Sequence, residues 1–244
     1  MTTNPATGEE LGAIADSTPV GLAFDVEEAI AHLRSVDPVL DKVIERVGGY
    51  RPNLRDDPYA SLLRTILFQQ LAGAAAHAIQ RRFLALYANE SAEPLPSDPR
   101  ATLPAALYPT PQQLLASTDE ELRATGISRQ KAAYMRDLAL HVAEGQLNFA
   151  ELPLLPDEEV VKRITAVKGL GEWSAHMFLM FHLGRPDVLP VGDLGVRNGM
   201  RIAYGLELSP TPAQAKEIGA KWAPFRSVGS WYMWRANEAV EPFV

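Results

Sequence analysis

An all-α fold is predicted for this chain by two observations. Apolar residues recur at helical spacing in one run after another, and most of these runs begin at an Asp, Ser or Thr that can cap a helix. No stretch alternates between apolar and polar residues as a half-buried strand would. With 244 residues, 47% of them hydrophobic, the chain can bury a core as one large domain or as two small lobes of packed helices.

Capping residues mark the expected helix starts in order along the chain. A side-chain oxygen just before a helix accepts hydrogen bonds from the free N–H groups of its first turn, and a proline directly after it suits that turn. These signals are Asp25, Asp37-Pro38, Asp57-Pro58, Thr110-Pro111, Thr118, Ser128 and Thr211-Pro212. Further helices are expected over 156–166, 172–183 and 194–204 and from Pro224 onward.

Two segments lack helical periodicity. Residues 1–22 are rich in Thr, Ala, Gly, Pro and Glu, which predicts a disordered tail ahead of a folded region over residues 23–244. The segment 89–111 is crowded with proline, serine and acidic residues and is interpreted as a surface loop.

The composition excludes several kinds of site. The chain has no cysteine, which rules out disulfides, thiolate metal sites and iron–sulfur clusters and fits a reducing, cytoplasmic setting. Its five histidines show no metal-ligand spacing with carboxylates. The N-terminal residues have neither a basic start nor an apolar run, so we expect a protein that is neither exported nor embedded in a membrane. Nothing suggests an oligomerisation surface, and a monomer is expected.

The stretch Val167-Lys168-Gly169-Leu170-Gly171-Glu172-Trp173-Ser174 predicts a tight hairpin between two helices. Two glycines around one apolar residue allow unusual backbone angles and close approach of another backbone. The second helix then begins with free N–H groups that point outward and suit an anion such as a phosphate. A hairpin that only joins two helices is the alternative interpretation.

Downstream, Pro190-Val191-Gly192-Asp193 delivers one carboxylate on a short loop just before a further helical run. An Asp at this position commonly caps the helix that follows. A carboxylate next to a phosphate-binding hairpin also suggests chemistry on DNA, and Asp193 is able to do both.

The hairpin Gly-Leu-Gly-Glu-Trp-Ser-Ala and the downstream Pro-Val-Gly-Asp resemble those of the helix-hairpin-helix (HhH-GPD) DNA glycosylases, in their alkylbase (3-methyladenine) branch. The resemblance extends from about Asp57 to the end of the chain and includes Gln69-Gln70-Leu71 and Trp234. It implies a two-lobed helical fold, here too short to contain the N-terminal β-rich domain of larger members.

For the hairpin, the resemblance implies contact with double-stranded DNA that contains damaged bases. The N–H groups of Gly169, Gly171 and Ser174 would hold a backbone phosphate, with Leu170 and Lys168 beside them. The carbonyls of Thr165, Val167 and Leu170 would hold a monovalent cation, and no other cofactor is required.

For the base, the resemblance implies a pocket made by Trp173 and Trp234. N-alkylated purines carry positive charge, so stacking on an indole gains a cation–π attraction of about 0.5–2 kcal/mol. Met177 and Tyr134 are further pocket candidates, although both are also explained by packing in the core. At the joint between two helices, Gln70 or Leu71 would fill the gap left by a flipped nucleotide, or the glutamines are a buried polar pair.

For the reaction, the resemblance implies that Asp193 stabilises the positive charge that builds on the sugar as the glycosidic bond breaks. Trp173 stands where the strand-cutting branch has a Schiff-base lysine, so a monofunctional glycosylase that uses water and leaves an abasic site is expected. The expected substrates are 3-methyladenine and 7-methylguanine. A non-catalytic DNA-binding module and a glycosylase for another class of lesion are the alternatives.

The net charge of −7 weighs against a DNA partner, because phosphate contact usually comes with a basic face. The acidic residues, however, gather outside the motifs, and binding through backbone amides needs less positive charge. We therefore expect modest non-specific affinity and a shallow dependence on salt.

Overall fold

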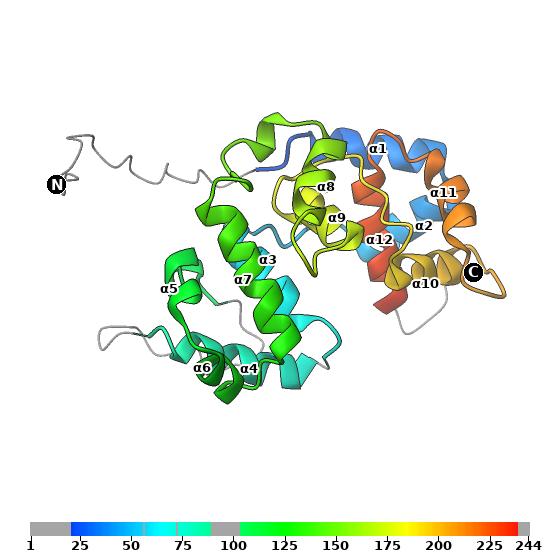
Figure 1. Cartoon of the computed structure of the whole chain (residues 1–244). Coiled ribbons are helices and arrows are strands. Elements are labelled where there is room, and N and C mark those ends of the chain that lie inside the picture. Colours follow the sequence, from blue (N-terminus) through cyan, green and yellow to red (C-terminus); the bar gives the residue numbers. More distant parts are fainter. Residues whose placement is uncertain (1–20, 56, 72, 89–102, 239–244) are drawn as a thin grey trace.

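The computed structural model describes residues 21–55, 57–71, 73–88 and 103–238. Over these residues the chain forms α-helices and two short 3-10 helices, and it contains no strand, which confirms the all-α prediction (Figure 1). Almost all of the predicted tail, and residues 89–102 of the predicted loop, lie outside the described residues. In the part that is described, no helix is long and apolar enough to cross a membrane.

The helices follow one another along the chain with short connections. In order they are α1 (Val26–Val36), α2 (Pro38–Val47), α3 (Pro58–Phe68), α4 (Gly73–Ala85), η1 (Ala105–Leu107), α5 (Pro111–Ala116), α6 (Asp119–Ala124), α7 (Arg129–Ala143), η2 (Leu152–Leu154), α8 (Asp157–Thr165), α9 (Glu172–Phe181), α10 (Leu194–Ala203), α11 (Pro212–Ala220) and α12 (Arg226–Glu238).

The predicted capping residues begin the helices as expected. Asp25, Asp37, Asp57 and Ser128 each accept a hydrogen bond from an N–H of the first turn. Thr110, Thr118 and Thr211 form complete capping boxes with the residue three positions on. Local hydrogen bonding therefore explains why these helices start where they do.

Helices α8 and α10 match their predicted ranges to within one residue at each end, whereas one boundary each of α9 and α12 moves by two residues. Helix α9 ends at Phe181, not at Leu183, because Leu183 N–H bonds back to the Phe178 carbonyl and Gly184 turns the chain with φ of +62°. Helix α12 begins at Arg226 and not at Pro224. The Arg226 N–H is taken by the Asp187 carboxylate, which caps this helix from a distant part of the chain.

Two hydrophobic clusters divide the core. The first is built from α3 to α9, and the second from α1, α2 and α10 to α12. Figure 1 shows the second set of helices together on the right, with α3 to α7 on the lower left and α8 and α9 between them. Phe181 and Trp234 pack against both clusters, so they mark the junction where α9, α10 and α12 approach one another.

Helices α10 and α12 pack unusually closely. A Cβ atom added at Gly199 on α10 would lie 1.9 Å from the Met233 carbonyl oxygen on α12. Only glycine permits this distance, because the obstacle is backbone and cannot swing aside. The contact holds the middle of α10 beside the C-terminal half of α12, and this arrangement positions the site described next.

Candidate active site at the junction of the two clusters

The Asp193 carboxylate lies at the start of α10 and receives three hydrogen bonds. Its Oδ1 accepts the Val196 N–H at 2.8 Å, so Asp193 is the N-cap of α10 as its position predicts. The same oxygen accepts the Trp234 indole N–H at 2.9 Å. Its Oδ2 accepts the Trp173 indole N–H at 2.7 Å. These three donors fix the orientation of the carboxylate.

Three helices bring these residues together. Trp173 belongs to the first turn of α9, Asp193 precedes α10, and Trp234 lies on α12. A Cβ at Gly195 would come within 2.8 Å of the Trp234 ring, so glycine there lets the indole reach Asp193. Trp173 is 47% exposed and Asp193 is partly exposed, so solvent reaches this side of the site.

Further aromatic and apolar side chains pack against Trp234 and the first cluster. The Phe181 and Trp234 ring centroids are 5.7 Å apart, and Met177 is half-buried against the first cluster. Trp222 and Trp231 are both buried in the second cluster. The site therefore combines one oriented negative charge with electron-rich indole surfaces.

The helical hairpin forms between α8 and α9. Gly169 has φ of +85°, and Gly171 is the N-cap of α9 with no side chain capping it. No side chain caps the first-turn N–H groups of α9. The Ser174 amide is one of these groups, and the Ser174 side chain is buried. These N–H groups remain available to an anion.

Tyr134 lies at this hairpin. A Cβ at Gly169 would be 2.2 Å from the Tyr134 ring, and the Tyr134 hydroxyl accepts a hydrogen bond from Gln130. Tyr134 therefore packs against the bend of the hairpin, and its place in the base pocket stays a prediction. These contacts explain why residue 169 must be glycine.

Lys168 contacts an acidic residue in the structure. Its N–H donates to Asp137 Oδ2 at 2.9 Å, and its ammonium group lies 3.1 Å from Asp137 Oδ1. Burial raises the pKa of Asp137, but the hydrogen bonds from Lys168 outweigh burial and hold that pKa below its ordinary value. Asp137 therefore anchors the hairpin to α7 as an ionised carboxylate.

The joint between α3 and α4 touches the same hairpin. The Gln69 side-chain amide donates to the Gly169 carbonyl at 2.7 Å. The next residue, Gln70, is exposed and has φ of +57°, a left-handed conformation that is uncommon outside glycine. Leu71 is half-buried. The backbone turn thus directs Gln70 outward while Gln69 ties the joint to the hairpin.

The sequence prediction overlooked two of these contributors, Asp137 and Gly195, which act on predicted site residues through contacts that no local pattern reveals. Gln69 was named in the predicted joint, and its hydrogen bond to the Gly169 carbonyl comes from the structure alone. Asp137 looks like any polar residue on a helix face.

No group of His, Cys, Asp and Glu side chains suited to a metal ion occurs among the described residues. At the hairpin, the Val167 carbonyl oxygen, one of the three predicted ligands of a monovalent cation, accepts the Leu170 N–H at 3.1 Å.

A family model described as "HhH-GPD superfamily base excision DNA repair protein" matches residues 63–225. The chain is 32% identical over 224 residues to DNA-3-methyladenine glycosylase 1 of Schizosaccharomyces pombe, covering 90% of this chain and 91% of that protein.

Two solved structures share the fold. One is the S. pombe 3-methyladenine DNA glycosylase in complex with abasic DNA, with a TM-score of 0.73, 31% identity, and coverage of 87% of this chain and 98% of that one. The other is a DNA-3-methyladenine glycosidase from Bacillus halodurans, with a TM-score of 0.71, 32% identity, and coverage of 86% and 88%.

Proposed function

Because this chain belongs to the HhH-GPD superfamily of base excision DNA repair proteins, we propose that it is a monofunctional DNA glycosylase that removes alkylated purines. The observation that carries the proposal is the convergence of Trp173 and Trp234 on Asp193. Relatives along nearly the whole chain are named 3-methyladenine glycosylases, which supports 3-methyladenine as a substrate. We propose 7-methylguanine as a second substrate because it is also a positively charged N-alkylated purine.

Asp193 would act on the sugar. When the C1′–N bond breaks, the base leaves with the bonding electrons and positive charge develops on the sugar ring. A carboxylate held in place beside that ring stabilises the charge without having to reorganise. Water then attacks C1′ and leaves an abasic site, and Trp173 offers no amine that could attack instead.

The indoles would select the base. An alkylated purine is electron-poor and positively charged, so the faces of Trp173 and Trp234 bind it more strongly than a normal base, by about 0.5–2 kcal/mol. The alkylated base is also a good leaving group. A strong general acid is therefore unnecessary for this substrate class.

The hairpin would hold the DNA. Uncapped N–H groups at the start of α9 suit a backbone phosphate, and the outward Gln70 or Leu71 would occupy the gap left by the flipped nucleotide. The carbonyls of Thr165, Val167 and Leu170 would hold a monovalent cation that adds positive charge near this phosphate. Lys168 would also contact the DNA while its ammonium group stays paired with Asp137. The protein would act as a monomer on chromosomal DNA in the cytoplasm.

The test is to incubate methylated duplex DNA with the wild type, with Asp193→Asn and with Asp25→Asn, and to analyse the released bases. Asp25 caps α1 just as Asp193 caps α10, so Asp25→Asn is a matched control. We expect the wild type and Asp25→Asn to release methylpurines at similar rates and Asp193→Asn to release them about 10²–10³-fold more slowly.

The strands should stay intact until the abasic sites are cleaved with alkali. Tight binding without release by the wild type would identify a non-catalytic module. Release only from oxidised or deaminated DNA would overturn the proposed substrate class.

A further inference from the structure

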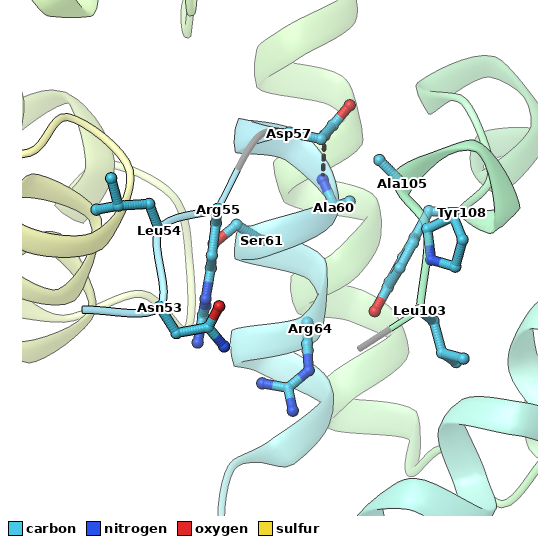
Figure 2. Close-up of a pocket in the computed structure, with 11 residues that line it drawn as sticks. Asn53, Leu54, Arg55, Asp57, Ala60, Ser61, Arg64, Leu103, Ala105 and Tyr108 are labelled. Atoms are coloured by element: carbon cyan, nitrogen blue, oxygen red, sulfur yellow. Dashed lines mark hydrogen bonds between the residues drawn. The ribbon is translucent and has the colours of Figure 1, made fainter. Parts of the chain in front are cut away.

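A pocket lies between α3 and the chain that leads into η1. It has a volume of about 260 Å³, and none of the residues around Asp193 lines it. Figure 2 shows Arg55, Ser61 and Arg64 along one side of α3, with Tyr108 facing them across the pocket. Neither the hairpin nor the indole site uses these residues.

The two arginines carry positive charge into this pocket. Arg55 Nη1 donates to the Ser61 hydroxyl at 3.0 Å, and the Arg64 guanidinium lies 4.1 Å from the centre of the Phe68 ring. Among the described residues, no carboxylate comes within 4.0 Å of either guanidinium. Burial, and then the charge of Arg64, lower the pKa of Arg55, so the two cations are held together at an energetic cost.

Asp57 lines the same pocket and is already engaged. Its Oδ1 accepts the Ala60 N–H at 2.7 Å as the cap of α3. Because an N-cap carboxylate is held by the helix it begins, Asp57 cannot move to neutralise the arginines without loss of the cap. The pocket therefore keeps a net positive charge among its described side chains.

Tyr108 adds a hydrogen-bond donor. The buried Gln80 amide donates to the Tyr108 oxygen, so the hydroxyl hydrogen is free to bond elsewhere. Burial raises the pKa of Tyr108, and the hydroxyl therefore keeps its proton at neutral pH. Two guanidinium groups and one phenol form a set of donors that suits an oxyanion.

We propose that this pocket binds a phosphate group. Arg55 and Arg64 would each donate to its oxygens, and Tyr108 would complete its coordination. Arg64 rests on Phe68, the last residue of α3, and Gln69 directly after it bonds the hairpin. Bound phosphate would thus restrain the helix that carries the joint. The proposal does not depend on the glycosylase activity.

The first measurement is thermal unfolding of the full chain in inorganic phosphate against chloride at equal ionic strength. We expect phosphate to raise the Tm of the wild type, and Arg64→Gln and Tyr108→Phe to weaken the apparent Kd for phosphate at least tenfold. Tyr108→Phe removes a single hydroxyl and guards against a folding defect. Arg123→Gln, a loss of charge on an exposed α6 residue, should bind phosphate as the wild type does.

The second measurement separates a DNA phosphate from a free one. If the pocket takes a backbone phosphate, Arg64→Gln should weaken undamaged duplex binding several-fold more than Arg123→Gln, and inorganic phosphate should compete with the duplex. If it takes a free phosphate compound, the two variants should bind duplex equally while only Arg64→Gln loses the phosphate effect. Equal stabilisation of the wild type, Arg64→Gln and Tyr108→Phe by phosphate, or none beyond chloride, would overturn the proposal.

Discussion

Asp37 and Asp193 use the same local chemistry in two different surroundings. Each is the N-cap of the helix that follows it, and each accepts an indole N–H, from Trp222 at 2.7 Å and from Trp173 and Trp234 at 2.7 and 2.9 Å. Asp37 is completely buried, whereas Asp193 is partly exposed.

The charges around the two carboxylates also differ. The Lys221 ammonium lies 3.2 Å from Asp37 Oδ2, and the Tyr204 hydroxyl bonds the same oxygen. Asp193 has no cationic side chain within 4.0 Å in the part of the chain that the structure describes. A carboxylate with its own cation stabilises the fold, while one without a cation remains free to stabilise a positive charge that appears during a reaction.

The comparison predicts its largest effect for Asp193→Asn. Asparagine keeps the cap but loses the charge, so single-turnover release of methylpurines should fall by about 10²–10³-fold, the usual cost of removing a preorganised electrostatic group. The Tm should stay within a few degrees of the wild type. If Asp193→Asn lowered the Tm and left the rate of methylpurine release unchanged, the roles assigned to the two carboxylates would be reversed.

Asp37→Ala should show the opposite pattern. It removes the cap of α2 and leaves the buried Trp222 and Tyr204 donors without an acceptor, which should lower the free energy of unfolding by about 3 kcal/mol. Denaturant titration measures this loss. Asp41→Ala, on the same helix, removes only the exposed ion pair with Arg34 and should cost less than about 1 kcal/mol.

Trp173→Phe and Trp234→Phe would sharpen the account of Asp193. Each keeps an aromatic ring and removes one indole N–H donor, so the rate of base release should fall by about tenfold, the cost of one hydrogen bond to a charged group. In the Asp193→Asn background either substitution should lower the rate of base release by a smaller factor, because the charge that accepts the hydrogen bond is gone. Equal losses in both backgrounds would mean that the indoles act only by stacking.

The smallest effect expected is on stability in acid. Burial raises the pKa of Asp37, but the hydrogen bonds from Trp222 and Tyr204 outweigh burial and hold it below its ordinary value. Because the folded-state pKa is the lower one, the stabilisation is complete above the unfolded pKa and is lost as pH falls through the folded one. Between about pH 5 and pH 2, unfolding free energy should therefore fall less steeply for Asp37→Asn than for the wild type. Parallel curves would contradict this.

The helical hairpin shows how far sequence and structure agree on the site. Gly169 indicates the bend directly, because few other residues adopt its φ of +85° and a Cβ there would lie 2.2 Å from the Tyr134 ring. Gly171 has ordinary extended backbone angles and open space beside it, so glycine is not required there. The supports of the bend were harder to foresee. Gln69 reaches Gly169 across 100 residues of chain, and Asp137 reaches Lys168 across 31, so no local spacing predicts either contact.

The sequence by itself determined the helices and the place of Asp193 at the start of one of them. The reason is that a cap is a bond between neighbours: Asp193 accepts from the N–H three residues on, as Asp37, Thr118 and Ser128 do.

Only the tertiary structure decided which distant side chains contact each capping carboxylate, and therefore whether that carboxylate supports the fold or the proposed reaction. Trp173 and Trp234 meet Asp193 across 20 and 41 residues, and Trp222 meets Asp37 across 185. These contacts depend on how the two hydrophobic clusters pack and on the close contact of Gly199 with Met233. The packing brings distant indoles to the partly exposed Asp193 and to the buried Asp37.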